Sequence, residues 1–263
     1  INAFTMGQRR RRLAACVAVG AAVATGVTGL GSAQGAPGRT DLPSAVPAAF
    51  TPGVNNGQIL GMAQVGSTMV VGGTFTSVSA AGTTTAVTRS KVFAFNAATG
   101  AISSFAPVLN GNVEAVEAGP TPNTVFIGGT FTTVNGVTAN RIALLDLTTG
   151  AAVPGFAPTN GFNGIVEDLE LSGGRLFVGG SFTKYKGVAH VGLATINPTT
   201  GALDPYMNLN LAGTHNNTGT GRVEKTGILD FDITADGTKM VAIGNFRSIG
   251  AEARTQVAVL DLG

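Results

Sequence analysis

The chain has 263 residues, of which 39 are glycine and none is tryptophan, and its formal net charge is +2. Four of its 16 basic residues are the arginines at 9–12, so the remainder carries 12 basic against 14 acidic residues, a net charge of −2. No basic stripe with interleaved aromatic residues is present, which argues against a nucleic-acid partner. Cys16 is the only cysteine, which excludes a disulfide framework.

The first 33 residues are typical of a secretory signal peptide. Four arginines form a basic head, the uncharged residues 13–30 follow, and Gly31, Ser32 and Ala33 are the small residues that a signal peptidase recognises. We therefore predict a secreted or extracellular protein that is cleaved near Ala33, with the general and twin-arginine export routes both open. A membrane-spanning helix over residues 13–30 is the alternative. Residues 34–44 are predicted to be a disordered lead-in.

Residues 45–263 are predicted to form one all-β repeat domain, because the same landmarks return in the same order. Asn96, Asp146 and Asn197 each precede a Thr-Gly pair, and they are spaced by 50 and then 51 residues. The glycines of these pairs are Gly100, Gly150 and Gly201. A second landmark is a glycine pair followed by Phe, at Gly72, Gly73 and Phe75, at Gly128, Gly129 and Phe131, and at Gly179, Gly180 and Phe182, with a degraded copy that ends at Phe246.

Each repeat is predicted to hold four short antiparallel strands, which is the composition of a β-propeller blade. In the second repeat the alternating residues 113–118 form the first strand, the apolar residues 124–131 the second and residues 141–147 the third. A short fourth strand leads into Phe156. Paired glycines weaken a strand, so their recurrence predicts a bulge or a close approach of another backbone. The Phe after each pair is predicted to be buried, and Asp236-Gly237 is predicted to be a turn.

Four blades are predicted, at residues 57–107, 111–158, 164–209 and 226–263. Residues 45–52 match the end of the second repeat and would supply the fourth strand of the last blade. That pairing would close a four-blade ring and remove an exposed sheet edge. A piece of a larger propeller fits the same pattern, and the sequence leaves both possibilities open.

These motifs together resemble the delta-60 repeat of exported bacterial β-propeller proteins. The resemblance rests on Gly-Gly-Thr/Ser-Phe-Thr, Asn135-Gly136, Ile142-Ala-Leu-Leu-Asp146, Thr149-Gly150 and Phe156-Ala-Pro158, and it extends over residues 45–263. It implies a propeller fold and an extracellular setting, and it supplies no established catalytic residues. The chain departs from the pattern in its last copy, where Ile243 replaces one glycine.

The last repeat contains an insertion. Phe182 and Phe246 are 64 residues apart, against 51 for Phe131 and Phe182, and the extra residues fall mainly at 211–226. Insertions in repeat proteins map to loops that often carry a binding face. The candidate ligand-binding residues are His215, Asn216, Asn217 and Arg222. A flexible polar spacer explains the same residues.

Acidic residues alternate on two of the predicted first strands. Alternation places Asp168 and Glu170 on one strand face, and likewise Asp230 and Asp232. Facing carboxylates could bind calcium or act as an acid/base pair, which makes Asp230 and Asp232 candidate metal ligands. A solvated strand face is the simpler explanation of these acids. Calcium is the only cofactor that this pattern suggests.

No coherent catalytic set emerges from the sequence, since neither His190 nor His215 stands near a nucleophile signature. We therefore expect a non-enzymatic binding or structural module whose partner is a glycan, a cell-wall component or a protein. The alternative is a propeller-scaffold enzyme acting on carbohydrate, either a quinoprotein-type sugar dehydrogenase or a polysaccharide lyase. Quinoprotein blades usually carry a docking tryptophan, which this chain lacks. Fold alone does not decide between these classes.

Overall fold

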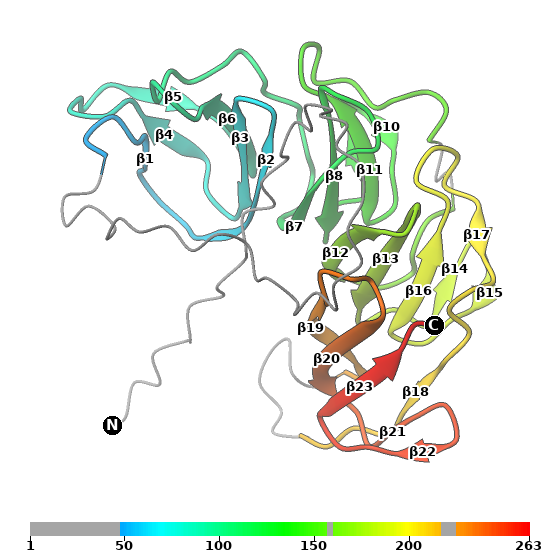
Figure 1. Ribbon diagram of the computed structural model, residues 1–263. Helices are drawn as coiled ribbons and strands as arrows, with labels where there is room; N and C mark the ends of the chain where they lie inside the picture. Colours follow the sequence, from blue (N-terminus) through cyan, green and yellow to red (C-terminus); the bar gives the residue numbers. More distant parts are fainter. Residues whose placement is uncertain (1–47, 157–159, 217–224) are drawn as a thin grey trace, which may run out of the picture.

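The computed structural model describes residues 48–156, 160–216 and 225–263, and every regular element in them is a β-strand. Successive antiparallel blades form an arc that runs from blue and cyan to orange and red in Figure 1. The all-β fold of propeller-type blades is therefore confirmed. The predicted signal peptide and lead-in, residues 1–44, lie outside the described residues. In the part that is described, no helix has the length and apolar character that a membrane crossing requires.

The strands divide into four blades. The first contains β1 (Gly53–Val54), β2 (Ile59–Val65), β3 (Thr68–Gly73), β4 (Ser77–Ser79), β5 (Ala86–Thr88) and β6 (Val92–Asn96). The second contains β7 (Val113–Ala118), β8 (Thr124–Gly129), β9 (Thr133–Val134), β10 (Val137–Thr138) and β11 (Ile142–Asp146). The third contains β12 (Val166–Ser172), β13 (Arg175–Gly180), β14 (Lys184–Tyr185), β15 (Val188–Ala189), β16 (Leu193–Ile196) and β17 (Leu203–Asp204). β18 (Leu211–Ala212) leads into the fourth, which contains β19 (Gly227–Ile233), β20 (Lys239–Asn245), β21 (Ser248–Ile249), β22 (Glu252–Ala253) and β23 (Val257–Asp261).

Each blade has a main sheet, ordered β2-β3-β6, β7-β8-β11, β12-β13-β16-β17 and β19-β20-β23 in turn. The predicted fourth strand is reduced in length. It is β17 in the third blade, and single bridges take its place in the first two, Phe95 with Ile102 and Leu145 with Ala152. In the fourth blade β23 is the last strand of the sheet among the described residues.

Each blade also has a small hairpin, which the sequence reasoning missed. β9 and β10 are joined by Asn135 and Gly136, whose φ angles are 49° and 79°. Lys186 and Gly187 join β14 and β15 with φ angles of 48° and 84°. Positive φ at both central residues defines a type I′ turn, for which Asn-Gly is the preferred sequence. The Asn135-Gly136 motif was therefore a usable signal for this hairpin.

The second glycine of each pair lies against the backbone of the first strand in its own blade. A Cβ on Gly129 would lie 2.1 Å from the carbonyl oxygen of Asn112, and one on Gly180 would lie equally close to that of Ile165. The facing first strands have register shifts at these points, for example between Val113 and Ala115. The predicted bulge and close approach are both confirmed.

The hydrophobic core is divided among the interfaces between neighbouring blades. One cluster joins Val70 of the first blade to Val116 of the second, and equivalent clusters join the second blade to the third and the third to the fourth. The first strands pack on one another in the order β2, β7, β12, β19. The Phe after each glycine pair is fully buried as predicted, at Phe75, Phe131, Phe182 and Phe246. Stability in such a stack comes from the contacts of each repeat with its neighbours.

The segment at residues 48–52 lies beside the first blade. A Cβ on Gly100 would be 1.8 Å from the carbonyl oxygen of Phe50, and one on Gly150 in the next repeat would be 3.6 Å from the nitrogen of Pro107. The end of one repeat thus packs on the Thr-Gly turn of the next. The described part of the predicted closing strand is not paired with β23, and residues 45–47 lie outside the described residues. The first and fourth blades stand at opposite ends of the arc (Figure 1), so no described strand closes a ring.

The side chains at Asn96, Asp146 and Asn197 cap the Thr-Gly turns. The Oδ1 atom of Asp146 accepts hydrogen bonds from the N–H groups of Thr148 (3.0 Å) and Thr149 (2.8 Å). Asn96 and Asn197 make the same pair of bonds in their own blades. The hydrogen bond from the Thr149 N–H is the main cause that holds the pKa of Asp146 below its ordinary value.

We expect Asp146→Asn to retain the stability of the wild type at neutral pH to within about 0.5 kcal/mol, because asparagine makes this turn twice elsewhere. A carboxylate whose pKa is lowered by folding stabilises above its unfolded pKa of about 4, and this stabilisation is lost as pH falls through the folded pKa. Urea unfolding at neutral pH and at about pH 3 should therefore show a smaller acid loss in the variant. An equal loss would show that this carboxylate does not contribute.

Candidate functional site on the fourth blade

Two carboxylates on β12 join the third blade to the fourth. Asp168 accepts a hydrogen bond from the N–H of Phe231 (2.9 Å), and Glu170 accepts one from the N–H of Ile233 (3.0 Å). Both acids therefore lie on one face, as the alternation predicted. Asp168 is only 3% exposed, which differs from a solvated strand face. Its charge is buried because backbone N–H groups of its own strand and of the next blade satisfy it.

The preceding interface has a related contact. Glu117 on β7 accepts a hydrogen bond from the N–H of Leu171 on β12 at 3.4 Å. Glu117 faces Phe126 across the ladder just as Glu170 faces Phe177, so the two glutamates occupy the same blade position. Acceptance of N–H groups from the following first strand is thus a recurring property of these acids.

Asp230 and Asp232 on β19 are the counterparts of Asp168 and Glu170. Asp230 stands opposite Ile243 as Asp168 stands opposite Gly179. Asp230 is half-buried and Asp232 is exposed, and neither receives a hydrogen bond from a described residue. Within residues 48–156, 160–216 and 225–263, no group of three or more His, Cys, Asp and Glu side chains is placed to hold a metal ion. The calcium site stays a prediction, and the two acids hold the ladder positions at which Asp168 and Glu170 accept N–H groups of the following blade.

Four apolar residues share the sheet face of these acids. The register places Asp230, Ile243 and Val257 in one row and Asp232, Val241 and Val259 in the next. Residues directly opposite in adjacent strands lie on the same face. We call these six residues the open face. Its apolar members are 41–63% exposed. Their counterparts in the second blade, Phe126, Ile142 and Leu144, are at most 3% exposed because the third blade covers them.

Ile243 replaces the glycine that the first three blades have at this point. A Cβ on Gly72 would lie 2.4 Å from Cγ1 of Val113, and one on Gly128 would lie 2.5 Å from Cγ1 of Val166. Both valines belong to the first strand of the following blade. Glycine is therefore required wherever a following blade packs in this way. Ile243 can stand at this point because its face of the fourth blade, opposite the one that packs on the third blade, is not covered by any described blade.

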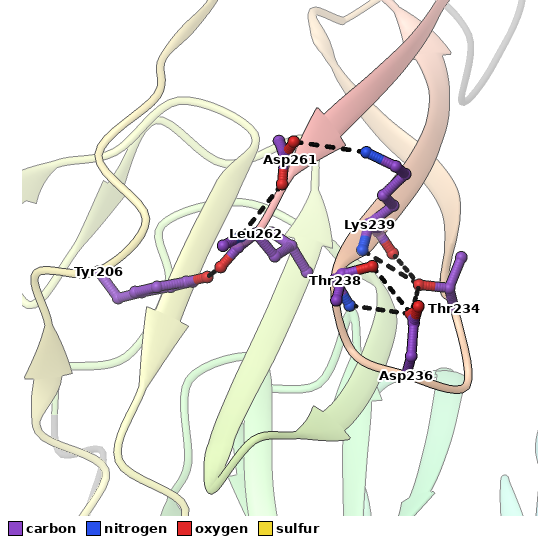
Figure 2. Close-up of polar contacts among 8 residues, drawn as sticks. Tyr206, Thr234, Asp236, Thr238, Lys239, Asp261 and Leu262 are labelled. Atoms are coloured by element: carbon purple, nitrogen blue, oxygen red, sulfur yellow. Dashed lines mark hydrogen bonds and ion pairs between the residues drawn. The ribbon is translucent and has the colours of Figure 1, made fainter. Parts of the chain in front are cut away.

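Two contacts hold the end of β23, which lies at the edge of the open face (Figure 2). Nζ of Lys239 lies 3.4 Å from Oδ2 of Asp261. The hydroxyl of Tyr206, from the third blade, donates a hydrogen bond to the carbonyl oxygen of Leu262. These contacts attach β23 both to its own sheet and to the preceding blade.

The predicted turn at Asp236 and Gly237 is confirmed, and Gly237 has a φ of 73°. Oδ1 of Asp236 accepts hydrogen bonds from the hydroxyl of Thr234 (2.5 Å) and from the N–H of Thr238 (3.1 Å), as Figure 2 shows. The Thr234 hydroxyl is the main cause that lowers the pKa of Asp236. This acid serves the turn and does not belong to the open face.

The insertion of the last repeat begins after β18. Oδ1 of Asn245 accepts the N–H groups of His215 (2.7 Å) and Asn216 (2.9 Å), and its Nδ2 donates to the carbonyl oxygen of Asn216 (3.0 Å). The other blades have Thr or Ser at the position of Asn245. The asparagine in the fourth blade therefore holds the start of the inserted loop through these three hydrogen bonds. The side chain of His215 is exposed. Asn217 and Arg222 lie outside the described residues, so the predicted ligand site stays a prediction.

His190 is buried in the third blade, and burial lowers its pKa. Its N–H donates to the carbonyl oxygen of Thr183, as the N–H of Ala139 donates to that of Thr132 in the second blade. The backbone of His190 therefore makes a hydrogen bond that also occurs at the equivalent position of the second blade.

These features define a protein built from β-propeller-type blades, in which the described blades at the two ends of the arc each have an exposed face. The family model described as "Domain of unknown function (DUF5122) beta-propeller" matches residues 123–148 and 172–205, which fall in the second and third blades. No curated protein matches the chain in sequence.

Three solved structures illustrate the similarity of fold. The computationally designed Ika4 protein has a TM-score of 0.42 and 12% identity, over 80% of this chain and 94% of that one. The Cps50 (Swd1) beta-propeller domain of Myceliophteria thermophila has a TM-score of 0.40 and 12% identity, over 73% and 50%. BamB from Moraxella catarrhalis has a TM-score of 0.37 and 19% identity, over 78% and 47%. The chain thus matches about half the length of the two natural structures, and this likeness concerns the fold alone.

Proposed function

We propose that this chain is a non-catalytic binding and structural module of a secreted or cell-surface protein, and that its partner is a protein. The open face is the observation that carries this proposal. Its residues correspond to ones that the other blades bury against a neighbouring polypeptide segment. Contiguous exposed apolar patches mark protein or membrane contacts or ligand-binding grooves, and the two acids in this face favour a protein. The export pattern at residues 9–33 supports the extracellular setting.

The acids that were candidates for chemistry support the same conclusion. Asp168 and Glu170 accept backbone N–H groups across a blade interface. Asp230 and Asp232 have the same positions on a face that is otherwise apolar. Such a face suits an extended polypeptide, which offers N–H groups and apolar side chains together. A glycan or a hydrated cation would leave the four apolar residues uncovered.

We expect calcium, a chelator and a panel of bacterial and plant polysaccharides to leave the thermal unfolding midpoint of the full chain unchanged. A ligand that binds the native state raises that midpoint by mass action, so binding would be visible as a shift. The same samples, with quinone and calcium added, should show no sugar oxidation and no lyase turnover.

The control is Asp230→Asn, which keeps the size of the side chain and removes its charge. A calcium-dependent rise in the midpoint that this variant lacks would contradict the proposal. Turnover that this variant loses would contradict it as well and would favour the carbohydrate enzyme.

A further inference from the structure

The chemistry of the open face defines its partner more closely, and this inference rests on the function proposed above. We propose that the open face receives the first strand of a propeller blade other than the four described. That strand carries small side chains, such as Gly, Ala or Ser, at the two positions that face Ile243. Ile243 thereby selects the partner strand and excludes the first strand of this chain.

Asp230 and Asp232 define the backbone of the partner. In the interface between the third and fourth blades, Asp168 and Glu170 accept N–H groups from residues 231 and 233 of one extended strand. Asp230 and Asp232 have the same spacing and the same ladder positions. They are therefore placed to accept two alternate N–H groups of a strand that follows the path of β19 one blade further on.

The side chains of β2 exclude this chain as its own partner. Ile59 and Met62 occupy the ladder positions of Val113 and Val116, whose side chains fill the space in front of Gly72. Ile59 and Met62 are 48% and 45% exposed, so they are available for such a contact. Ile243 already occupies the space that these two side chains would need. Neither ring closure nor head-to-tail association fits the interface geometry of the other blades.

A strand with small side chains resolves this conflict. The volume that Val113 and Val116 fill against Gly72 would be filled from the opposite side by Ile243. Cores accept such exchanges when the total volume is conserved. Val241, Val257 and Val259 would then be buried as their counterparts are in the other blades.

Two reciprocal changes in the full chain test this proposal. Ile243→Gly restores the interface of the other blades, and Ile59→Ala with Met62→Ala gives β2 the small side chains that the open face requires. Both variants should bring β2 onto the open face, within one molecule or between molecules. We expect amide hydrogen exchange in β2 and β19 to slow by about tenfold in each variant, which corresponds to about 1.4 kcal/mol of added local stability. Sedimentation velocity distinguishes ring closure from association.

Val137→Gly is the matched control, because Val137 is an exposed apolar strand residue away from the open face, and it should change neither measurement. The wild type should be a monomer with rapid exchange in both strands. The proposal would be overturned if the wild type associated as strongly as Ile243→Gly, or if its β2 and β19 amides exchanged as slowly as in that variant. Unchanged exchange in both variants would overturn it too. The double Ala variant replaces only exposed side chains, so it remains informative if Ile243→Gly is unstable. Catalytic turnover would instead contradict the proposed function.

Discussion

Gly128→Val is expected to destabilise the chain by about 3 kcal/mol, because the new side chain would enter the interface between the second and third blades. Its Cβ alone would lie 2.5 Å from Cγ1 and 3.2 Å from Cβ of Val166, which is fully buried. The β-branched side chain of valine is restricted at χ1, and its Cβ would be in the same place in every rotamer. Relief therefore requires the two blades to separate, and separation exposes the cluster around Leu169 and Phe126.

Urea unfolding followed by circular dichroism measures this effect. Gly53→Val is the matched control, since it makes the same change in a strand where nothing lies within 4 Å of the added Cβ. We expect the control to stay within about 0.5 kcal/mol of the wild type. If both variants had equal stability, the blades would not be stacked through these glycines.

Asp168→Ala is expected to destabilise the chain by about 3 kcal/mol. The carboxylate accepts the buried N–H groups of Leu169 and Phe231, both at 2.9 Å. Alanine leaves these two donors without an acceptor in a region that water does not reach. The loss should appear as weaker attachment of the fourth blade, with faster amide exchange in β19 than in β8.

Asp230→Ala is the control for this prediction, because Asp230 holds the same ladder position with no described partner. Its effect should stay within about 0.5 kcal/mol. If Asp230→Ala cost as much as Asp168→Ala, the fourth blade would have a neighbour in solution, and the open face would be covered.

Much of the blade could be predicted because its determinants are local. The Asx turn at Asp146 uses residues within three positions of it, and the glycine pairs mark a hairpin whose strands are adjacent in sequence. The burial of Phe131 and its counterparts follows from their recurrence once per repeat. These features can be predicted from one repeat without knowing how the neighbouring blades pack on it.

The contacts between blades could not be predicted in the same way. The bond from Phe231 to Asp168 joins residues 63 positions apart, and no local pattern shows that a strand acid faces another backbone. The same applies to Ile243, whose meaning depends on which strand lies in front of it. The same limit applies to residues 45–52, since repeat matching does not show which blade a strand joins, and the described residues 48–52 are not paired with β23.

Amide hydrogen exchange of β23 compared with β11 tests the uncovered fourth blade most directly. The two strands have equivalent ladder positions, and only β11 is covered by a following blade. We predict that exchange in β23 is at least about tenfold faster than in β11 in the full chain. Equal protection of the two strands would contradict an open face and would show that the fourth blade is covered in solution.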